Sequence, residues 1–496
     1  MNLMYRSTRD SRNRLTASQA VLQGLSSDGG LFVPEQIPVL DKTMDQLSQM
    51  DYRELAYEVM KLFLTDYTEQ ELKDCINKAY DDKFDTTEIA PLKQVGQEYY
   101  LELFHGPTIA FKDMALSILP HLLTKAAKKN DVKEEIVILT ATSGDTGKAA
   151  LAGFADVEGT SIIVFYPKDG VSSVQEKQMV TQQGANTHVI GITGNFDDAQ
   201  TGVKKMFNDT ELANRLKAAG YLFSSANSIN IGRLVPQIAY YVYAYATLYK
   251  NKQLQPDESI NFAVPTGNFG NILAAYYAKA IGLPIHKLIC ASNENKVLYD
   301  FFQTGSYDRN RDFILTESPS MDILVSSNLE RLIYAIADSD SDKTAELMEA
   351  LSKKGAYEIT ADMKAKLEGF VGGWASEAET KKAIKKVYDD YGYVLDTHTA
   401  VAASVYDRYK KETGDNAKTI IVSTASPYKF AASVLTALTT EIGTKSDYEQ
   451  AELLSKVSVT DIPKAVEELQ NAPVLHNIVC ETGKMQYIVE KILKII

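Results

Sequence analysis

The spacing of apolar and polar residues changes along the chain and predicts two kinds of region. Residues 43–90 place apolar positions three and four apart, as in the run YRELAYEVM at 52–60, which is typical of amphipathic helices. From about residue 96, short apolar runs are followed by glycine-containing turns and alanine-rich stretches. This order indicates strands, loops and helices in alternation, so we expect a parallel α/β core after a helical N-terminal region.

Four short apolar runs are the strands that we expect in this core. They cover residues 136–140, 161–166, 261–265 and 419–423. In open parallel sheets, ligands bind at the carboxyl ends of the strands. We therefore expect the polar and glycine-rich loops that follow these runs to lie at a common site.

Helical periodicity returns in the second half of the chain. Residues 340–390 are rich in Lys, Glu and Ala and predict solvated helices, with Gly372 and Gly373 as a break. Residues 436–496 predict a helical tail. The chain should then divide into an N-terminal domain at 1–95, an α/β region at 96–435 that includes a smaller subdomain at about 113–235, and a C-terminal helical tail at 436–496.

The charge balance limits the partners that we expect. The chain has 52 Lys and Arg residues against 65 Asp and Glu residues, a formal net charge of −13. This field repels nucleic-acid backbones and anionic lipids, so we expect neither nucleic acid nor a membrane as a partner. An anionic substrate would need a local cluster of hydrogen-bond donors. The first residues lack the apolar stretch of a signal peptide, and we expect a cytoplasmic protein.

The cysteines exclude two structural devices. Cys75, Cys290 and Cys480 are odd in number, widely spaced and without a CxxC pair, so we expect no disulfide framework and no metal site. We interpret them as buried small apolar residues.

Lys112 is the candidate nucleophile. It lies in the run HGPTIAFKDMAL at 105–116, between apolar residues and the start of an expected helix. An apolar setting and a helix N-terminus both disfavour the ammonium form, and a neutral amine is what imine formation requires. On spacing alone, a surface lysine that caps a strand is the alternative.

Two glycine loops are candidate anion sites. The run GNFGN at 267–271 lies between a strand and a helix, where free backbone amides suit a phosphate. The run TATSGDTGK at 140–148 has the wrong glycine spacing for a nucleotide-binding P-loop, but its hydroxyls and amides suit a carboxylate or a second phosphate. The alternatives are an ordinary turn for the first loop and a Ser/Thr-rich helix cap for the second.

A fourth loop, STASPYKF at 423–430, follows the last expected strand. It is weak on its own: Lys429 is expected on a solvated face, and Ser426 and Pro427 are typical of a simple turn.

Taken together, these loops resemble the threonine synthase family of fold type II pyridoxal-phosphate enzymes. The resemblance is collinear over nearly the whole chain, since further matching runs stand in the same order: STR at 7–9, SDGGLFVPE at 27–35, VSSVQE at 171–176, GNFDDAQ at 194–200, SANSINIGR at 225–233 and SPSMDI at 318–323. The resemblance implies an α/β fold with two three-layer parallel-sheet domains, besides the N-terminal helical domain and the helical tail.

The resemblance also implies the chemistry of the site. Lys112 would hold pyridoxal 5'-phosphate as a Schiff base and act as a base at Cα. The cofactor phosphate would bind at Gly267, Asn268, Phe269 and Asn271, with Gly270 permitting the turn, and Thr424 would bond the pyridine nitrogen. The implied substrate contacts are Thr142, Ser143, Asp145, Thr146 and Arg233, of which Arg233 would bind the substrate phosphate.

The implied reaction is γ-elimination of phosphate from O-phospho-L-homoserine and addition of water at Cβ, giving L-threonine and phosphate in the last step of threonine biosynthesis. The base at Cβ is open between Lys112 and the substrate phosphate. Ser426 stands where many family members have histidine, which puts fine contacts around the cofactor ring in doubt. We expect no regulation by S-adenosylmethionine, and a monomer or a small homo-oligomer.

Two alternatives stay open. One is another fold type II activity, such as a serine/threonine dehydratase or a β-replacing synthase, although these relatives usually carry asparagine at the position of Asp145. The other is a non-catalytic binding protein that has kept the fold, against which intact Lys112 and both glycine loops argue.

Overall fold

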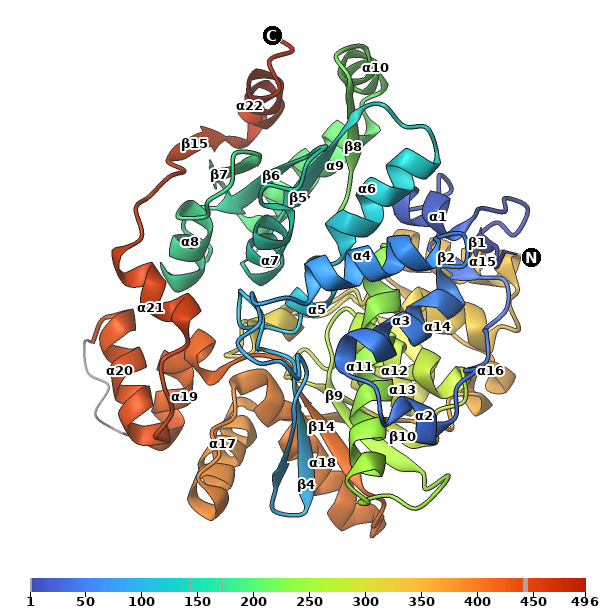
Figure 1. Ribbon diagram of the computed structural model, residues 1–496, viewed down its shortest axis with the longest axis vertical. Coiled ribbons are helices and arrows are strands. Elements are labelled where there is room, and N and C mark those ends of the chain that lie inside the picture. Colours follow the sequence, from blue (N-terminus) through green and yellow to red (C-terminus); the bar gives the residue numbers. More distant parts are fainter. Residues whose placement is uncertain (1, 143, 172, 440–444) are drawn as a thin grey trace.

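A computed structural model describes residues 2–142, 144–171, 173–439 and 445–496 of the chain, and two sheets organise it (Figure 1). The larger sheet has six strands, in the spatial order β13 (Phe370–Trp374), β10 (Ile285–Ser292), β9 (Ile260–Pro265), β14 (Thr419–Ser423), β4 (Glu98–Glu102) and β3 (Leu92–Val95). Neighbouring strands are parallel, except that β3 is antiparallel to β4.

The smaller sheet has five parallel strands and lies above the larger one in Figure 1. Its order is β15 (Ile478–Glu481), β7 (Thr187–Thr193), β6 (Thr160–Pro167), β5 (Glu135–Ala141) and β8 (Tyr221–Ser224). All residues of β6 are buried, because helices cover both faces of a parallel sheet. The four expected strands are confirmed as β5, β6, β9 and β14.

Helices cover both faces of each sheet, as the expected three-layer architecture requires. In β6, Ile162 and Val164 face one apolar core, whereas Ile163 and Phe165 face another. Around the smaller sheet pack α6 (Leu119–Lys129), α7 (Asp145–Phe154), α8 (Ser173–Val180), α9 (Phe196–Asn208), α10 (Thr210–Ala218) and α22 (Met485–Ile492).

The larger sheet has two separate cores. One lies under α11 (Ile231–Lys250), α12 (Gly270–Ala280), α13 (Val297–Thr304) and α14 (Leu329–Ile336). The other lies under α17 (Glu377–Tyr391), α18 (Thr397–Thr413), α19 (Ala431–Leu438) and α20 (Asp447–Ser458).

The N-terminal region is mainly helical, as predicted. The short strands β1 (Tyr5–Ser7) and β2 (Phe32–Pro34) pair antiparallel, and α1 (Ala17–Gln23) lies between them in the chain. The helices α2 (Met44–Leu47), α3 (Tyr52–Phe63) and α4 (Glu69–Ala79) follow, and each begins with a capping box. Residues 92–95, which follow this region, form β3 of the larger sheet.

Two expectations for the second half were wrong in detail. Gly372 and Gly373 do not interrupt helices but lie in β13, after α15 (Ser341–Lys354), β12 (Ala356–Glu358) and α16 (Ala361–Ala365). A Cβ on Gly373 would lie 2.4 Å from a methyl of Val405, so glycine lets α18 approach the strand. The tail is not wholly helical either: after α21 (Lys464–Asn471), β15 joins the smaller sheet.

None of the helices in the described part of the chain has the length and apolar character needed to cross a membrane. Cys75, Cys290 and Cys480 are free and buried, as expected, and burial raises the pKa of Cys75 and of Cys290 to about 12.

Candidate active site

Lys112 lies between the two sheets, at the start of α5 (Asp113–Leu116). Its side chain is only 13% exposed, and its amine donates to the Ser320 hydroxyl at 3.3 Å. Burial lowers the pKa of Lys112 to about 8; Asp145 opposes this shift, and Lys429 and Arg233 add to it. The structure therefore presents Lys112 as a buried amine that is partly neutral at neutral pH, not as a surface lysine.

The loop before Lys112 is folded by Asp113. The Asp113 carboxylate accepts hydrogen bonds from the Thr108 amide at 2.8 Å and from the Thr108 hydroxyl at 2.6 Å. Gly106 is needed here, because a Cβ at this position would lie 2.6 Å from the Cβ of Asp113. The run HGPT thus sets the direction from which the chain enters α5.

Thr424 reaches the same place from the end of β14. Its carbonyl oxygen accepts the Phe111 amide at 2.8 Å, and Ala425 forms a β-bridge with Ala110. The Thr424 amide donates to the Thr399 hydroxyl at 3.3 Å. These backbone bonds join the fourth loop to the Lys112 loop, as the sheet-edge argument predicts.

The run at 267–271 forms a tight turn before α12. Its left-handed residue is Phe269, with φ 65°, whereas Gly270 already begins the helix, so the turn is not made where the sequence suggested. Phe269 is buried beside Phe302 and Phe370. Gly267 is closely packed, since a Cβ there would lie 2.8 Å from the Ser320 carbonyl oxygen.

Asn271 gives this turn a free donor. Its side-chain oxygen accepts the hydroxyls of Tyr240 at 2.5 Å and Tyr241 at 2.6 Å. This pairing turns the amide nitrogen the other way, and that buried nitrogen has no hydrogen-bond partner among the described residues. An orphaned donor beside a helix N-terminus fits a phosphate oxygen.

The run at 140–148 is arranged differently. The Thr142 hydroxyl accepts the amides of Gly144 and Gly147 at 3.0 and 2.9 Å, so it caps α7. Thr146 is half-buried on the first turn of α7, and Ser143 lies outside the described residues. Asp145 is buried and takes part in a network that crosses to the larger sheet.

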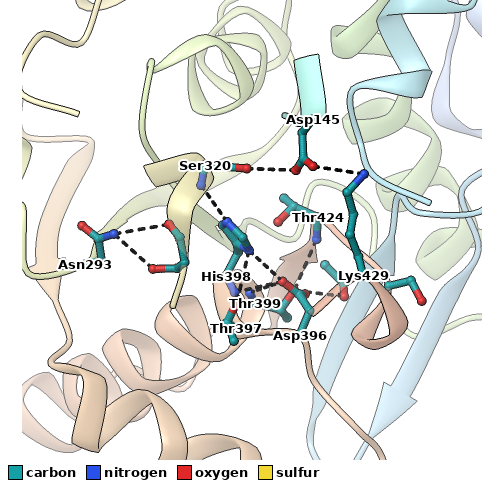
Figure 2. Close-up of polar contacts among 12 residues, drawn as sticks. Asp145, Asn293, Ser320, Asp396, Thr397, His398, Thr399, Thr424 and Lys429 are labelled. Carbon is teal, nitrogen blue, oxygen red and sulfur yellow. Dashed lines mark hydrogen bonds and ion pairs between the residues drawn. The ribbon is translucent and has the colours of Figure 1, made fainter. Parts of the chain in front are cut away.

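Lys429 was predicted wrongly as a solvated residue. Its side chain has no exposed surface, and its amine lies 3.2 Å from Asp145 (Figure 2). The amine also donates to the Thr108 carbonyl at 2.9 Å. Burial raises the pKa of Asp145, but Lys429 and Lys112 outweigh it and hold that pKa well below its usual range. The run STASPYKF gave no sign of this pairing, because the partner carboxylate lies on the other sheet.

Arg233 is buried on the first turn of α11. One terminal nitrogen donates to the Ala226 carbonyl at 2.9 Å, while its Nε has no partner in the part of the chain that the structure describes. Burial lowers the pKa of Arg233 to about 10, so the guanidinium stays charged. The charge of Arg233 also contributes to the lowered pKa of Lys112. A charged guanidinium with an unpaired N–H can bind an anion.

Sequence reasoning missed a further group around Lys112. Ser320, His398 and Asp396 lie between the Asp145 carboxylate and the start of α18 (Figure 2). The Asp-x-x-Thr spacing at 396–399 could have indicated a helix cap, but nothing local connects it to Ser320. Among the described residues there is no group of three or more His, Cys, Asp or Glu side chains that could hold a metal ion.

Comparison with known families gives matches along the chain. Residues 4–80 match "Threonine synthase N terminus", residues 85–425 match "Pyridoxal-phosphate dependent enzyme" and residues 399–477 match "Threonine synthase, C-terminal". The second match alone covers more than half of the chain.

Similar proteins are found among both sequences and structures. Human threonine synthase-like 1 is 42% identical over 434 residues, 85% of this chain and 58% of the relative. This chain thus spans less than two thirds of that relative's length.

Threonine synthase of Saccharomyces cerevisiae is 37% identical over 469 residues, which is 88% of this chain and 89% of the relative. The crystal structure of PLP-bound threonine synthase from Brucella melitensis superposes with a TM-score of 0.87 at 34% identity and covers 99% of both chains. The chain therefore belongs to the threonine synthase family of pyridoxal-phosphate dependent enzymes.

Proposed function

We propose that this chain converts O-phospho-L-homoserine and water into L-threonine and phosphate, as a carbon–oxygen lyase acting on phosphates. The observation that supports this most is the place of the Lys112 amine, which is buried against a turn that contacts the cradle at 267–271 and whose pKa is lowered in part by the charge of Arg233. A phosphorylated amino acid and a phosphorylated cofactor need two anion sites near one amine.

The residues present fit pyridoxal phosphate. We propose that Lys112 holds its carbonyl carbon, that Thr424 meets its ring nitrogen, and that its phosphate binds at Gly267, Asn268, Phe269, Gly270 and Asn271. The orphaned amide nitrogen of Asn271 supports the phosphate site. When bound, the cofactor supplies an electron sink for the pair of electrons left when a proton leaves the substrate.

The chain's own residues then move protons and hold the substrate. A pKa of about 8 leaves part of Lys112 neutral at neutral pH, as a base at Cα requires. Arg233 would bind the substrate phosphate through its fork of donors. The base at Cβ stays open between Lys112 and the substrate phosphate.

Thr142, Ser143, Asp145 and Thr146 are proposed substrate contacts as well. The Asp145 carboxylate is ionised and would repel the substrate carboxylate, so we assign it to the side of the substrate that carries the amine. We further propose a cytoplasmic location and a monomer or small homo-oligomer. The domain boundaries at 95, 435 and around 113–235 stay predictions.

The test is to measure phosphate and threonine in the same samples of wild type and Lys112→Ala, with O-phospho-L-homoserine as substrate. We expect equal amounts of both products from wild type and neither from Lys112→Ala. Lys133→Ala is the control, because the Lys133 side chain is 85% exposed. Phosphate without threonine would favour a dehydratase, and no turnover by wild type would favour a binding protein.

A further inference from the structure

The run SPSMDI at 318–323 has no role in the proposed function, yet it packs against the Lys112 amine. Its short helix η1 (Pro319–Met321) presents the Ser320 hydroxyl to the Lys112 amine at 3.3 Å. The Ser320 carbonyl oxygen lies where a Cβ on Gly267 would meet it at 2.8 Å. One turn therefore contacts both the amine and the proposed phosphate cradle.

This turn is fixed by two buried side chains, one directly after β10 and one on the first turn of α18. Asn293 donates to the Asp322 carboxylate at 2.7 Å and to the Ser318 hydroxyl at 3.1 Å. His398 accepts the Ser320 backbone amide at 3.1 Å through Nε2 (Figure 2). The ring of His398 is 3% exposed and packs beside the ring of Phe430 at 4.8 Å.

The bonds around His398 determine which of its nitrogens carries the proton. A backbone amide can only donate, so Nε2 must present its lone pair to Ser320. The proton of the neutral ring is then on Nδ1, which lies 3.2 Å from the Asp396 carboxylate. Asp396 is itself held in place, because it caps α18 by accepting the amides of His398 and Thr399.

The same reasoning sets the direction of the Ser320 hydroxyl. It donates to the Asp145 carboxylate at 3.1 Å, so its lone pairs face Lys112. A neutral amine has two N–H bonds and one lone pair. When one N–H is donated to Ser320, the direction of the lone pair is restricted.

We propose that His398 is a positioning residue for this reaction: its neutral Nδ1–H form holds Ser320, and the Ser320 hydroxyl aims the lone pair of Lys112. This inference rests on the proposed function for its kinetic consequence, but its proton arrangement belongs to the protein alone. Ser320 is then the group that touches the reacting amine, and His398 acts through it.

The first measurement is the tautomer of His398, by nitrogen-detected NMR of histidine-labelled full-length protein with and without pyridoxal phosphate. The chain has 6 histidines, and single substitutions assign them. We expect the Nδ1–H form in the cofactor-free protein. The Nε2–H form would overturn the proposal whatever reaction the protein catalyses.

The second measurement compares Ser320→Ala, His398→Leu and His398→Gln with wild type. We expect kcat to fall about 10-fold in Ser320→Ala and His398→Leu, with KM within about 2-fold, because the amine loses its orientation but the substrate contacts remain. The glutamine oxygen can accept the Ser320 amide, so His398→Gln should recover most of the loss. His286→Gln, at a ring that is 49% exposed, is the matched control.

A purely structural role is distinguished by the deuterium isotope effect at Cα. Misdirection of the base slows proton transfer and raises this effect, whereas partial unfolding or loss of cofactor lowers the active fraction and leaves it unchanged. An unchanged isotope effect in Ser320→Ala and His398→Leu, or an unchanged kcat in both, would overturn the proposal. If the wild type makes no threonine, the proposed function is refuted. The NMR experiment would still test whether His398 carries its proton on Nδ1.

Discussion

The two glycine loops have similar sequences but differ in the hydrogen-bond donors that they leave available to a ligand. At 267–271, the side chains of Phe269 and Asn271 are held by neighbouring aromatic residues, and the amide nitrogen of Asn271 has no hydrogen-bond partner within the described ranges. In the run at 140–148, the hydroxyl of Thr142 accepts two backbone amides, and the carboxylate of Asp145 contacts Lys429, Ser320 and Gln175. The first loop offers hydrogen-bond donors to an anion, whereas the second already contains an anion, the Asp145 carboxylate.

This difference shows that a glycine turn at a helix N-terminus favours a negative charge there. It does not determine whether that charge comes from a side chain or from a ligand. In α7 the charge comes from the chain itself, because Asp145 is the first residue of the helix. In α12 the first turn carries no acidic residue, so a ligand phosphate can take that place.

The largest effect should come from removing the cation that balances Asp145. We expect Lys429→Met to lower the free energy of unfolding by about 3 kcal/mol, because Lys112 is then the one ion-pair partner left to this buried carboxylate among the described residues. Urea unfolding of the cofactor-free protein measures this. Adding Asp145→Asn should restore most of the loss.

A surface ion pair serves as the control for this comparison. Lys385 on α17 pairs with Asp389, and both side chains are 48% exposed. Lys385→Met should change the free energy of unfolding by at most about 0.5 kcal/mol. If Lys429→Met costs no more than this, the Asp145 carboxylate is not the buried charge that distinguishes the two loops.

The second effect is the titration of Lys112, whose pKa is raised by Asp145 and lowered by Lys429. Competitive acetylation of the cofactor-free protein should show Lys112 reacting with a midpoint near pH 8. Asp145→Asn should lower the midpoint and Lys429→Met should raise it.

The lowered pKa of Lys112 also determines how the stability of the folded protein changes with pH. The folded pKa of about 8 lies below the unfolded value of 10.5, so the unfolded chain holds a proton that the folded protein has released between these values. Lys112 therefore makes the folded state more stable as pH rises from about 8 to about 10.5. A Lys112 midpoint near pH 10.5 would contradict the burial that separates this amine from a surface lysine.

The strands and the loops that follow them could be predicted from the sequence, because short apolar runs and glycine turns specify them locally. The four apolar runs became strands, two in each sheet, and the loop after β14 meets the Lys112 loop. Lys429 could not be placed in this way: nothing beside it in the chain indicates burial, which depends on Asp145 in the other sheet. The same holds for β15, whose pairing with β7 is made by distant residues.

The turn at Phe269 shows a different limit. The resemblance implied that Gly270 permits the turn, but the residue with the positive φ is Phe269. Packing of its ring against Phe302 and Phe370 outweighs the strain of a left-handed residue. Such a trade between strain and burial cannot be read from residue preferences alone.

A smaller effect should come from filling the space at Gly267. In Gly267→Ala the new Cβ would lie 2.8 Å from the Ser320 carbonyl oxygen and 3.1 Å from the Met321 Cα, and neither backbone atom can move away cheaply. We expect the dissociation constant for pyridoxal phosphate, measured by fluorescence titration, to rise about 10-fold, or about 1.4 kcal/mol. Gly483→Ala is the control, since a Cβ there has no neighbour within 4 Å among the described residues. Equal affinities of the two variants would remove the contact between the cradle and the Ser320 turn.

The smallest effect should come from the tyrosines that orient Asn271. Tyr241→Phe removes the hydroxyl that donates to the Asn271 oxygen at 2.6 Å and leaves the one from Tyr240. With about 1 kcal/mol lost, the cofactor should bind about 5-fold more weakly, because the amide nitrogen is no longer held toward the phosphate. Tyr245→Phe, on the same helix, loses a hydroxyl that donates to the Glu258 carbonyl at 2.9 Å, away from the cradle, and should bind the cofactor as wild type does. Weakening by both substitutions would mean that α11 acts on the cradle through its general packing, and the free donor that sets this loop apart from the Asp145 loop would then have no role of its own.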